Sequence, residues 1–129
     1  MIPPRHTFLL ILLPMLGTFL SMRLFLHLVR VQHVYPGGYL VHHLFTGAVI
    51  VILAAFVLAF DPVRRRTAIL ARVALGVGSA MVLDEIVYLV MTKASDDDYV
   101  SRLSLFGGAG FVAAGAVVLW LICKFKNTR

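Results

Sequence analysis

The stretch that decides the fold is residues 69–92, ILARVALGVGSAMVLDEIVYLVMT. It is long enough to cross a bilayer, because a spanning helix needs about 20 mostly apolar residues at a rise of about 1.5 Å each. It also carries the adjacent acids Asp84 and Glu85. Ionisable side chains inside a membrane are costly and are functional candidates by default. The stretch therefore predicts both a membrane protein and a polar site within it.

Three further apolar stretches of similar length lie along the chain. Together the four stretches predict membrane spans at about residues 7–29, 39–60, 69–92 and 102–123. None shows the period-two alternation of a barrel strand, so helix is predicted throughout. We therefore expect an all-α integral membrane protein, built over residues 1–129 as a single four-transmembrane-helix bundle.

The composition supports this class. Of the 129 residues, 60% are hydrophobic and 14% are charged, whereas a soluble domain has about 45–50% and about 25%. This excess excludes an ordinary soluble enzyme and a disordered chain. The single cysteine excludes an intrachain disulfide and a cysteine-cluster metal site. The net charge of +6 comes from basic residues at the ends of apolar stretches, so membrane lipids rather than nucleic acid are the expected partners.

The distribution of basic residues predicts the orientation. In a four-span arrangement, one side of the membrane receives most of them, namely Arg5, Arg64, Arg65, Arg66, Lys124, Lys126 and Arg129. Short cytoplasmic segments carry an excess of Lys and Arg. We therefore expect both termini to be cytoplasmic.

Polar side chains inside the predicted spans gather at one depth. Each span contributes to this set: Arg23 and His27 in the first, His42 and His43 in the second, Asp84 and Glu85 in the third, and Arg102 and Ser104 at the start of the fourth. With the orientation above, all of them fall in the outer half of the bilayer, and the exception among the strongly polar residues of the spans is Arg72, near the cytoplasmic end of the third. Four separate helices that agree on one depth predict a functional site there.

A metal centre is the first interpretation of this set. Nitrogen and oxygen ligands suited to Zn, Fe or Mn come from His27, His42, His43, Asp84 and Glu85. Adjacent residues on a helix project about 100° apart, so neither the two adjacent histidines nor the two acids are expected to bind one ion together.

Such a centre would make the protein a metal-dependent enzyme acting on a lipid or a small amphiphile. A metal-bound water is a nucleophile near neutral pH. Whichever of Asp84 and Glu85 is not a ligand would act as the general base, and Arg23 or Arg102 would stabilise developing negative charge.

Two other interpretations stay open. Intramembrane chains of Asp, Glu and His are typical of proton relays, which predicts a proton-coupled transporter or channel subunit. A chain this short would act as an oligomer to enclose a pathway. Alternatively, Arg23 or Arg102 pairs with Asp84 or Glu85 and the polar contacts hold the helices in register, as in a structural or assembly protein.

Small residues at helical spacing predict where helices approach closely. Gly76 and Ala80 lie four residues apart in the third span, and Gly107 and Gly115 lie on one face of the fourth. Small residues in this arrangement favour helix packing within membranes. We expect these residues to pack the third span against the fourth.

The motif His42-His43-x-x-x-Gly47, followed by Gly76-x-Gly78 and then Asp84-Glu85, resembles a group of small prokaryotic multi-span membrane proteins. The resemblance covers the second and third spans. It implies a paired His-His and Asp-Glu motif and a location in the cytoplasmic membrane of a prokaryote, without implying an activity.

Overall fold

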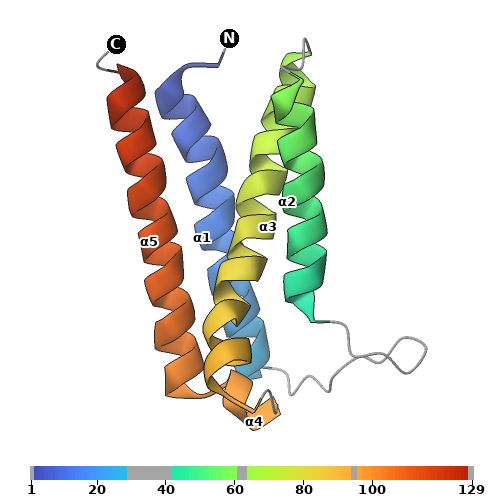
Figure 1. The fold of residues 1–129 in the computed structure, drawn as a ribbon, viewed down its shortest axis with the longest axis vertical. Helices are drawn as coiled ribbons and strands as arrows, with labels where there is room; N and C mark the ends of the chain where they lie inside the picture. Colours follow the sequence, from blue (N-terminus) through green and yellow to red (C-terminus); the bar gives the residue numbers. More distant parts are fainter. Residues whose placement is uncertain (1, 29–41, 61–63, 94–95, 128–129) are drawn as a thin grey trace, which may run out of the picture.

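The structure is a computed structural model that describes residues 2–28, 42–60, 64–93 and 96–127 (Figure 1). All regular elements in these ranges are helices, which confirms the predicted all-α class. They are α1 (Pro4–Leu28), α2 (His43–Ala59), α3 (Arg65–Met91), α4 (Asp96–Tyr99) and α5 (Arg102–Asn127).

Three of these helices are long and apolar enough to cross a membrane: Pro4–Leu26 within α1, Arg65–Met91, and Arg102–Lys126 within α5. The predicted span at residues 39–60 differs. Its helix, α2, is apolar but has only 17 residues, because it begins at His43 after His42, whose backbone is extended. The four-helix bundle is thus confirmed, whereas four full-length spans are not.

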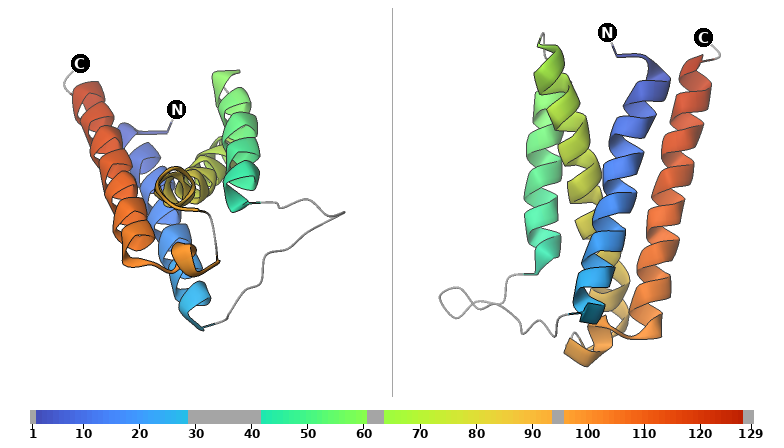
Figure 2. Two further views of the ribbon diagram at one scale, coloured as in Figure 1. Left: turned by 60° about the horizontal axis from the view of Figure 1, so that its bottom comes forward. Right: turned by 180° about the vertical axis from the view of Figure 1, so that it is seen from behind.

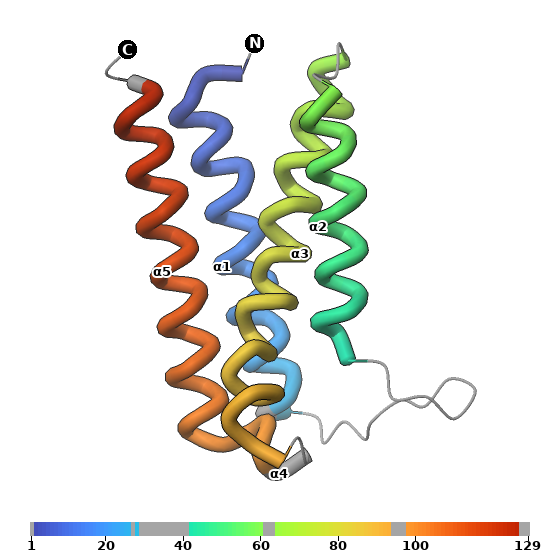
Figure 3. The backbone as a smooth tube through the Cα atoms, viewed as in Figure 1, coloured from blue at the N-terminus to red at the C-terminus, as the bar shows by residue number. Residues whose placement is uncertain are grey.

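Helices α1, α2, α3 and α5 run alternately up and down, so that each is antiparallel to the one before it (Figure 3). Helix α3 is central: it packs against α1, α2 and α5, and α1 also packs against α5. Viewed with the lower end forward, α3 lies between α2 and the pair α1 and α5 (Figure 2). Helix α1 begins and α5 ends at the same end of the bundle (Figure 1). The cytoplasmic position of the termini stays a prediction.

Helices α3 and α5 meet at the predicted glycines. A Cβ added at Gly107 would overlap the side chain of Val87, and one at Gly115 would lie 3.2 Å from Leu83 Cδ1. The same prediction is wrong for Gly76, which faces α1: a Cβ there would overlap the carbonyl oxygen of Ile11. The four-residue spacing of Gly76 and Ala80 identifies a face of α3 that is made of small residues. It does not identify which helix packs against that face.

Helices α2 and α3 also approach through glycine. A Cβ at Gly47 would lie 2.7 Å from the carbonyl oxygen of Gly78, and one at Gly78 would lie 2.7 Å from that of Gly47. This close approach places the first turn of α2 beside the second half of α3, where the two acids lie. The motif pair His-His and Asp-Glu is thereby brought together.

Candidate functional site

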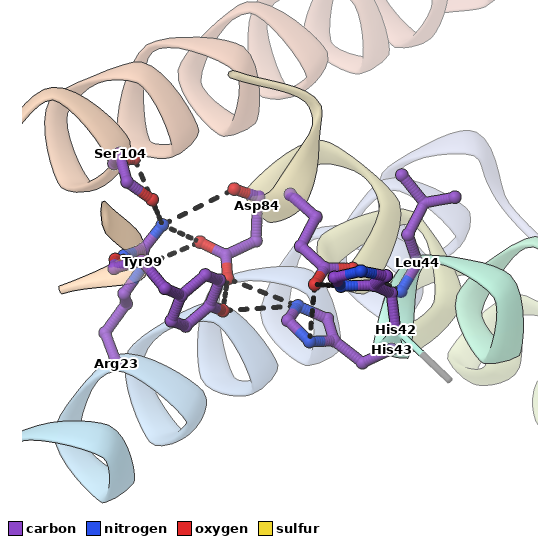
Figure 4. A network of polar contacts seen from close by, with 8 residues as sticks. Arg23, His42, His43, Leu44, Asp84, Tyr99 and Ser104 are labelled. Atoms are coloured by element: carbon purple, nitrogen blue, oxygen red, sulfur yellow. Dashed lines mark hydrogen bonds and ion pairs between the residues drawn. The ribbon is translucent and has the colours of Figure 1, made fainter. Parts of the chain in front are cut away.

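A network of polar groups joins the helices (Figure 4), and it includes α4, which lies at the end of the bundle opposite the start of α1 (Figure 1). Its members are Arg23 of α1, His42, His43 and Leu44 at the start of α2, Asp84 and Glu85 of α3, Tyr99 of α4, and Ser104 of α5. The predicted clustering at one depth is therefore accompanied by direct contact.

A buried ion pair between Arg23 and Asp84 is the centre of the network. The Nε and Nη2 atoms of Arg23 lie 2.7 and 2.6 Å from Asp84 Oδ1. Asp84 is 0% exposed and Arg23 is 7% exposed. A buried charge is stabilised only when it is paired and hydrogen-bonded, so each residue depends on the other.

The guanidinium of Arg23 is also surrounded by neutral oxygen atoms. It donates through Nη1 to the carbonyl oxygen of Tyr99 at 2.9 Å, and through Nη2 to the carbonyl oxygen and Oγ of Ser104, both at 3.1 Å. It also lies over the Tyr99 ring, 4.7 Å from the centroid, where a cation is attracted to the ring face. The charge of Arg23 therefore has favourable contacts besides the carboxylate.

Gly108 of α5 makes room for this ion pair. A Cβ at this position would lie 2.9 Å from Asp84 Oδ1 and 3.1 Å from Arg23 Nη2. Contacts this short would push α5 away or displace the pair, so the absence of a side chain here is part of the site's construction. The spacing analysis singled out the neighbouring glycine, Gly107, and missed Gly108.

Tyr99 completes the hydrogen bonding of Asp84. Its hydroxyl donates to Asp84 Oδ2, and its ring packs edge-on against Tyr88, 5.0 Å between centroids. Burial, together with the negative charge of Asp84, raises the pKa of the Tyr99 phenol above its ordinary value. The phenol therefore stays protonated at neutral pH and acts as the donor in this contact.

Glu85 holds the beginning of α2. Its Oε2 accepts a hydrogen bond from the backbone N–H of Leu44 at 2.6 Å, and its Oε1 lies 3.0 Å from His42 Nδ1. A helix begins with unpaired N–H groups, which an anionic group stabilises. Here the capping carboxylate comes from another helix, which explains why α2 starts at His43, several residues later than the apolar pattern predicts.

His43 lies between the two carboxylates. Its Nε2 is 3.5 Å from Asp84 Oδ2 and 3.2 Å from the Tyr99 hydroxyl, while its Nδ1 is 3.4 Å from Glu85 Oε1. The two ring nitrogens thus face different acids, Nε2 toward Asp84 and Nδ1 toward Glu85 (Figure 4). One imidazole connects the Arg23–Asp84 pair to the acid that caps α2.

The structure brings together six of the predicted residues: Arg23, His42, His43, Asp84, Glu85 and Ser104. Arg102 is exposed at the start of α5, and the guanidinium on Asp84 is that of Arg23. The side chain of His27 lies outside the described residues. Tyr99 was missed, because it follows an acidic run that reads as a solvated loop; a tyrosine next to a membrane boundary was the available signal.

A metal ligand set is not evident from this geometry. Among the side chains that the structure describes, which exclude that of His27, no three of His, Cys, Asp or Glu are arranged to hold a metal ion. The structure therefore identifies none of these side chains as a ligand. The predicted Zn, Fe or Mn centre, and the enzymatic role built on it, remain predictions.

The chain was compared with known proteins at three levels. No protein-family model, no curated protein and no solved structure matches it.

Replacing Tyr99 with phenylalanine removes the donor to Asp84 and keeps the ring. Since a hydrogen bond to a charged group contributes about 1.5–3 kcal/mol, we expect the free energy of unfolding to fall by about that amount. Denaturation in mixed detergent micelles, followed by circular dichroism, measures it. Phenylalanine keeps the ring contacts with Arg23 and Tyr88, so any loss of stability comes from the hydroxyl. An unchanged free energy of unfolding would show that the hydroxyl contributes nothing.

Proposed function

We propose that this chain is a proton-conducting membrane protein, a proton-coupled transporter or channel subunit, in which His43 passes protons between Glu85 and Asp84. The observation that supports the proposal is the position of one imidazole between two buried carboxylates. A protein that needs only helix register requires the Arg23–Asp84 pair but no such bridge. Enclosing a pathway with access from both sides requires an oligomer.

The imidazole suits this role because of its two nitrogens. A neutral imidazole has one N–H and one lone pair, whereas the protonated ring has two N–H groups. A proton on Glu85 can move to Nδ1 of His43, which gives the ring a positive charge. The proton on Nε2 then leaves toward Asp84 Oδ2, and the ring is neutral again with its other nitrogen protonated. Once the proton has left Asp84, a flip of the ring restores the starting arrangement for the next proton, whereas reverse transfer would only return the first proton to Glu85.

The charges around the bridge allow for one exchangeable proton. With both imidazoles neutral and both acids ionised, Arg23, Asp84 and Glu85 together carry a net charge of −1. One additional proton on the cluster makes it neutral, which a buried environment favours. Uptake and release of a single proton therefore alternate the cluster between two states of different charge.

Asp84 is able to accept the proton because Arg23 keeps other partners. If the carboxylate becomes neutral, the guanidinium still donates to the oxygens of Tyr99 and Ser104. The cationic charge is then not left without contacts. The surrounding oxygens thus lower the cost of the state in which the proton lies on Asp84.

Proton flux into liposomes tests the proposal. The full chain is reconstituted with a pH-sensitive dye inside, and a potassium diffusion potential drives protons inward. Loss of a positioned proton-transfer group slows transfer by two or more orders of magnitude in enzymes, so we expect His43→Gln to reduce flux by at least about tenfold. The matched control is His6→Gln, because His6 is exposed at the opposite end of the bundle.

Three outcomes contradict the proposal. The first is wild-type flux equal to that of empty liposomes, and the second is undiminished flux in a folded His43→Gln variant. The third concerns the metal hypothesis: about one Zn, Fe or Mn per purified chain, lost in His42→Ala, would assign these side chains to a metal centre instead. Elemental analysis of the same preparations separates this result from the other two.

A further inference from the structure

The opposite end of the bundle, where α1 begins and α5 ends, carries a basic surface. Its exposed cationic side chains are Arg5, Arg64, Arg65, Arg66, Lys124 and Lys126. Among the described residues, no Asp or Glu lies at this end, since the described acids belong to the second half of α3 and to α4. In the described ranges, the charged side chains at this end are therefore all basic.

Arg72 lies beneath this surface, inside the span formed by α3. Its Nη1 donates to the carbonyl oxygen of Ala68, one turn nearer the start of the helix, at 2.8 Å. Its Nε is buried and has no hydrogen-bond partner in the part of the chain that the structure describes. Arg23 faces a carboxylate, whereas the Nε–H group of Arg72 is a buried donor without an acceptor among the described residues.

The depth of Arg72 matches the boundary between acyl chains and headgroups. Helix α3 has 27 residues and so a length of about 40 Å, which equals the bilayer thickness with its headgroups. Arg72 is seven residues from the start of α3, about 10 Å along its axis. Because the side chain bends back toward Ala68, its guanidinium reaches outward to the phosphate level, as snorkelling arginines do.

Arg72 lies on a stripe of α3 between the buried small residues Ala68 and Gly76. Gly76, one turn further along the same face of α3, contacts α1 at Ile11, so Arg72 lies along the interface of these two helices. Leu70 is 67% exposed and Leu9 is 45% exposed. Each lies two residues, about 200° of helix rotation, from Arg72 or Ile11, so these leucines form the lipid-facing sides of α3 and α1 beside the interface. A lipid at this interface would bring an anion to the arginine and hydrocarbon to those outer faces.

We propose that Arg72 binds the phosphate of an anionic phospholipid whose acyl chains cover the adjoining faces of α1 and α3. The guanidinium fork suits a phosphate, which it binds through paired donors. The exposed arginines and lysines of the basic end attract anionic headgroups and raise their local concentration. Arg72, which is partly buried, selects one lipid among them.

The single tryptophan of the chain reports this binding. Trp120 is seven residues from the end of α5, at the basic end, where Lys124 lies over its ring. The full chain is reconstituted into vesicles of phosphatidylcholine with increasing spin-labelled phosphatidylglycerol, and quenching of Trp120 gives the relative affinity for the anionic lipid. Inorganic phosphate, added in excess, competes if the site takes a free anion rather than a lipid.

Salt separates Arg72 from the exposed residues around it. Salt screens exposed charges far more than partly buried ones. At high salt we expect the wild type and Arg65→Gln to keep a preference for phosphatidylglycerol, while Arg72→Gln loses it. Since one basic residue contributes about 1 kcal/mol to anionic lipid binding, the loss should be roughly fivefold. Arg72→Lys, which keeps the charge without the fork, should be intermediate.

The proposal is overturned if folded Arg72→Gln keeps the preference at high salt, or if Arg65→Gln loses it equally. It is also overturned if inorganic phosphate removes the preference, because the ligand would then be a free anion. If Arg72→Gln does not fold, the comparison of Arg72→Lys with wild type decides the result, and equal affinities would contradict the proposal.

Discussion

Replacing Arg23 with methionine should lower the free energy of unfolding by about 3–5 kcal/mol, the range found when one partner of a buried ion pair is removed. The substitution leaves the carboxylate of Asp84, which is 0% exposed, without the guanidinium that contacts it at 2.6–2.7 Å. It also removes the hydrogen bonds that Arg23 donates to the carbonyl oxygens of Tyr99 and Ser104. Denaturation in mixed detergent micelles, followed by circular dichroism, gives the change.

The matched control is Arg5→Met, on the same helix. Arg5 is exposed, and a surface substitution of this kind usually changes stability by less than about 0.5 kcal/mol. A loss of comparable size in both variants would mean that the general removal of positive charge matters, and not the buried pair.

A double variant separates the pair from its surroundings. When Asp84→Leu is added to Arg23→Met, no unpaired charge is left from this pair, so the loss should be smaller than the sum of the two single losses. Groups in direct contact usually show coupling energies of about 0.5–3 kcal/mol. If the two single losses simply add up, Arg23 and Asp84 contribute independently to stability, although their side chains are in direct contact.

The sequence predicts the helices better than their ends. Long apolar stretches must be helical within a membrane, because every backbone polar group needs a partner inside its own segment. The start of α2 depends on something else, the carboxylate of Glu85 on the N–H of Leu44. This contact joins residues 41 positions apart in the chain, and no local pattern contains it.

The site was predictable in depth but not in its pairings. Counting residues from the span ends places Arg23 and Asp84 at one level, and the same count includes Arg102. Which arginine faces the acid depends on how each helix is rotated about its own axis, and packing against the neighbouring helices sets that rotation. Gly108 contributes here, since it admits the Arg23–Asp84 pair where a side chain would obstruct it.

Tyr99 shows a different limit of the sequence. The residues around it have no apolar periodicity, so nothing indicated that they fold into a short helix against the bundle. The role of Tyr99 depends on residues of other helices, because its hydroxyl contacts Asp84 and His43. A loop residue that completes a site between helices becomes evident only when those helices are assembled.

The contact between α1 and α3 gives a second large effect, tested with two glycines. A Cβ at Gly76 would overlap the carbonyl oxygen of Ile11, and a backbone atom cannot turn away as a side chain can. We expect Gly76→Ala to separate the two helices and to lower the free energy of unfolding by about 1–3 kcal/mol, the usual cost of overpacking. The same denaturation measurement applies.

Gly110→Ala is the matched control, and we expect it to have the opposite sign. A Cβ at Gly110 would meet no atom within 4 Å, so only the helix propensity changes there, and alanine exceeds glycine by about 1 kcal/mol. That gain is also present in Gly76→Ala, where the steric conflict must exceed it.

If both variants are stabilised, the two helices adjust to the methyl group at little cost, and the close approach at Ile11 is not what holds α1 beside α3. If Gly76→Ala alone is destabilised, the position of Arg23 opposite Asp84 depends on this contact, since the same two helices carry both residues.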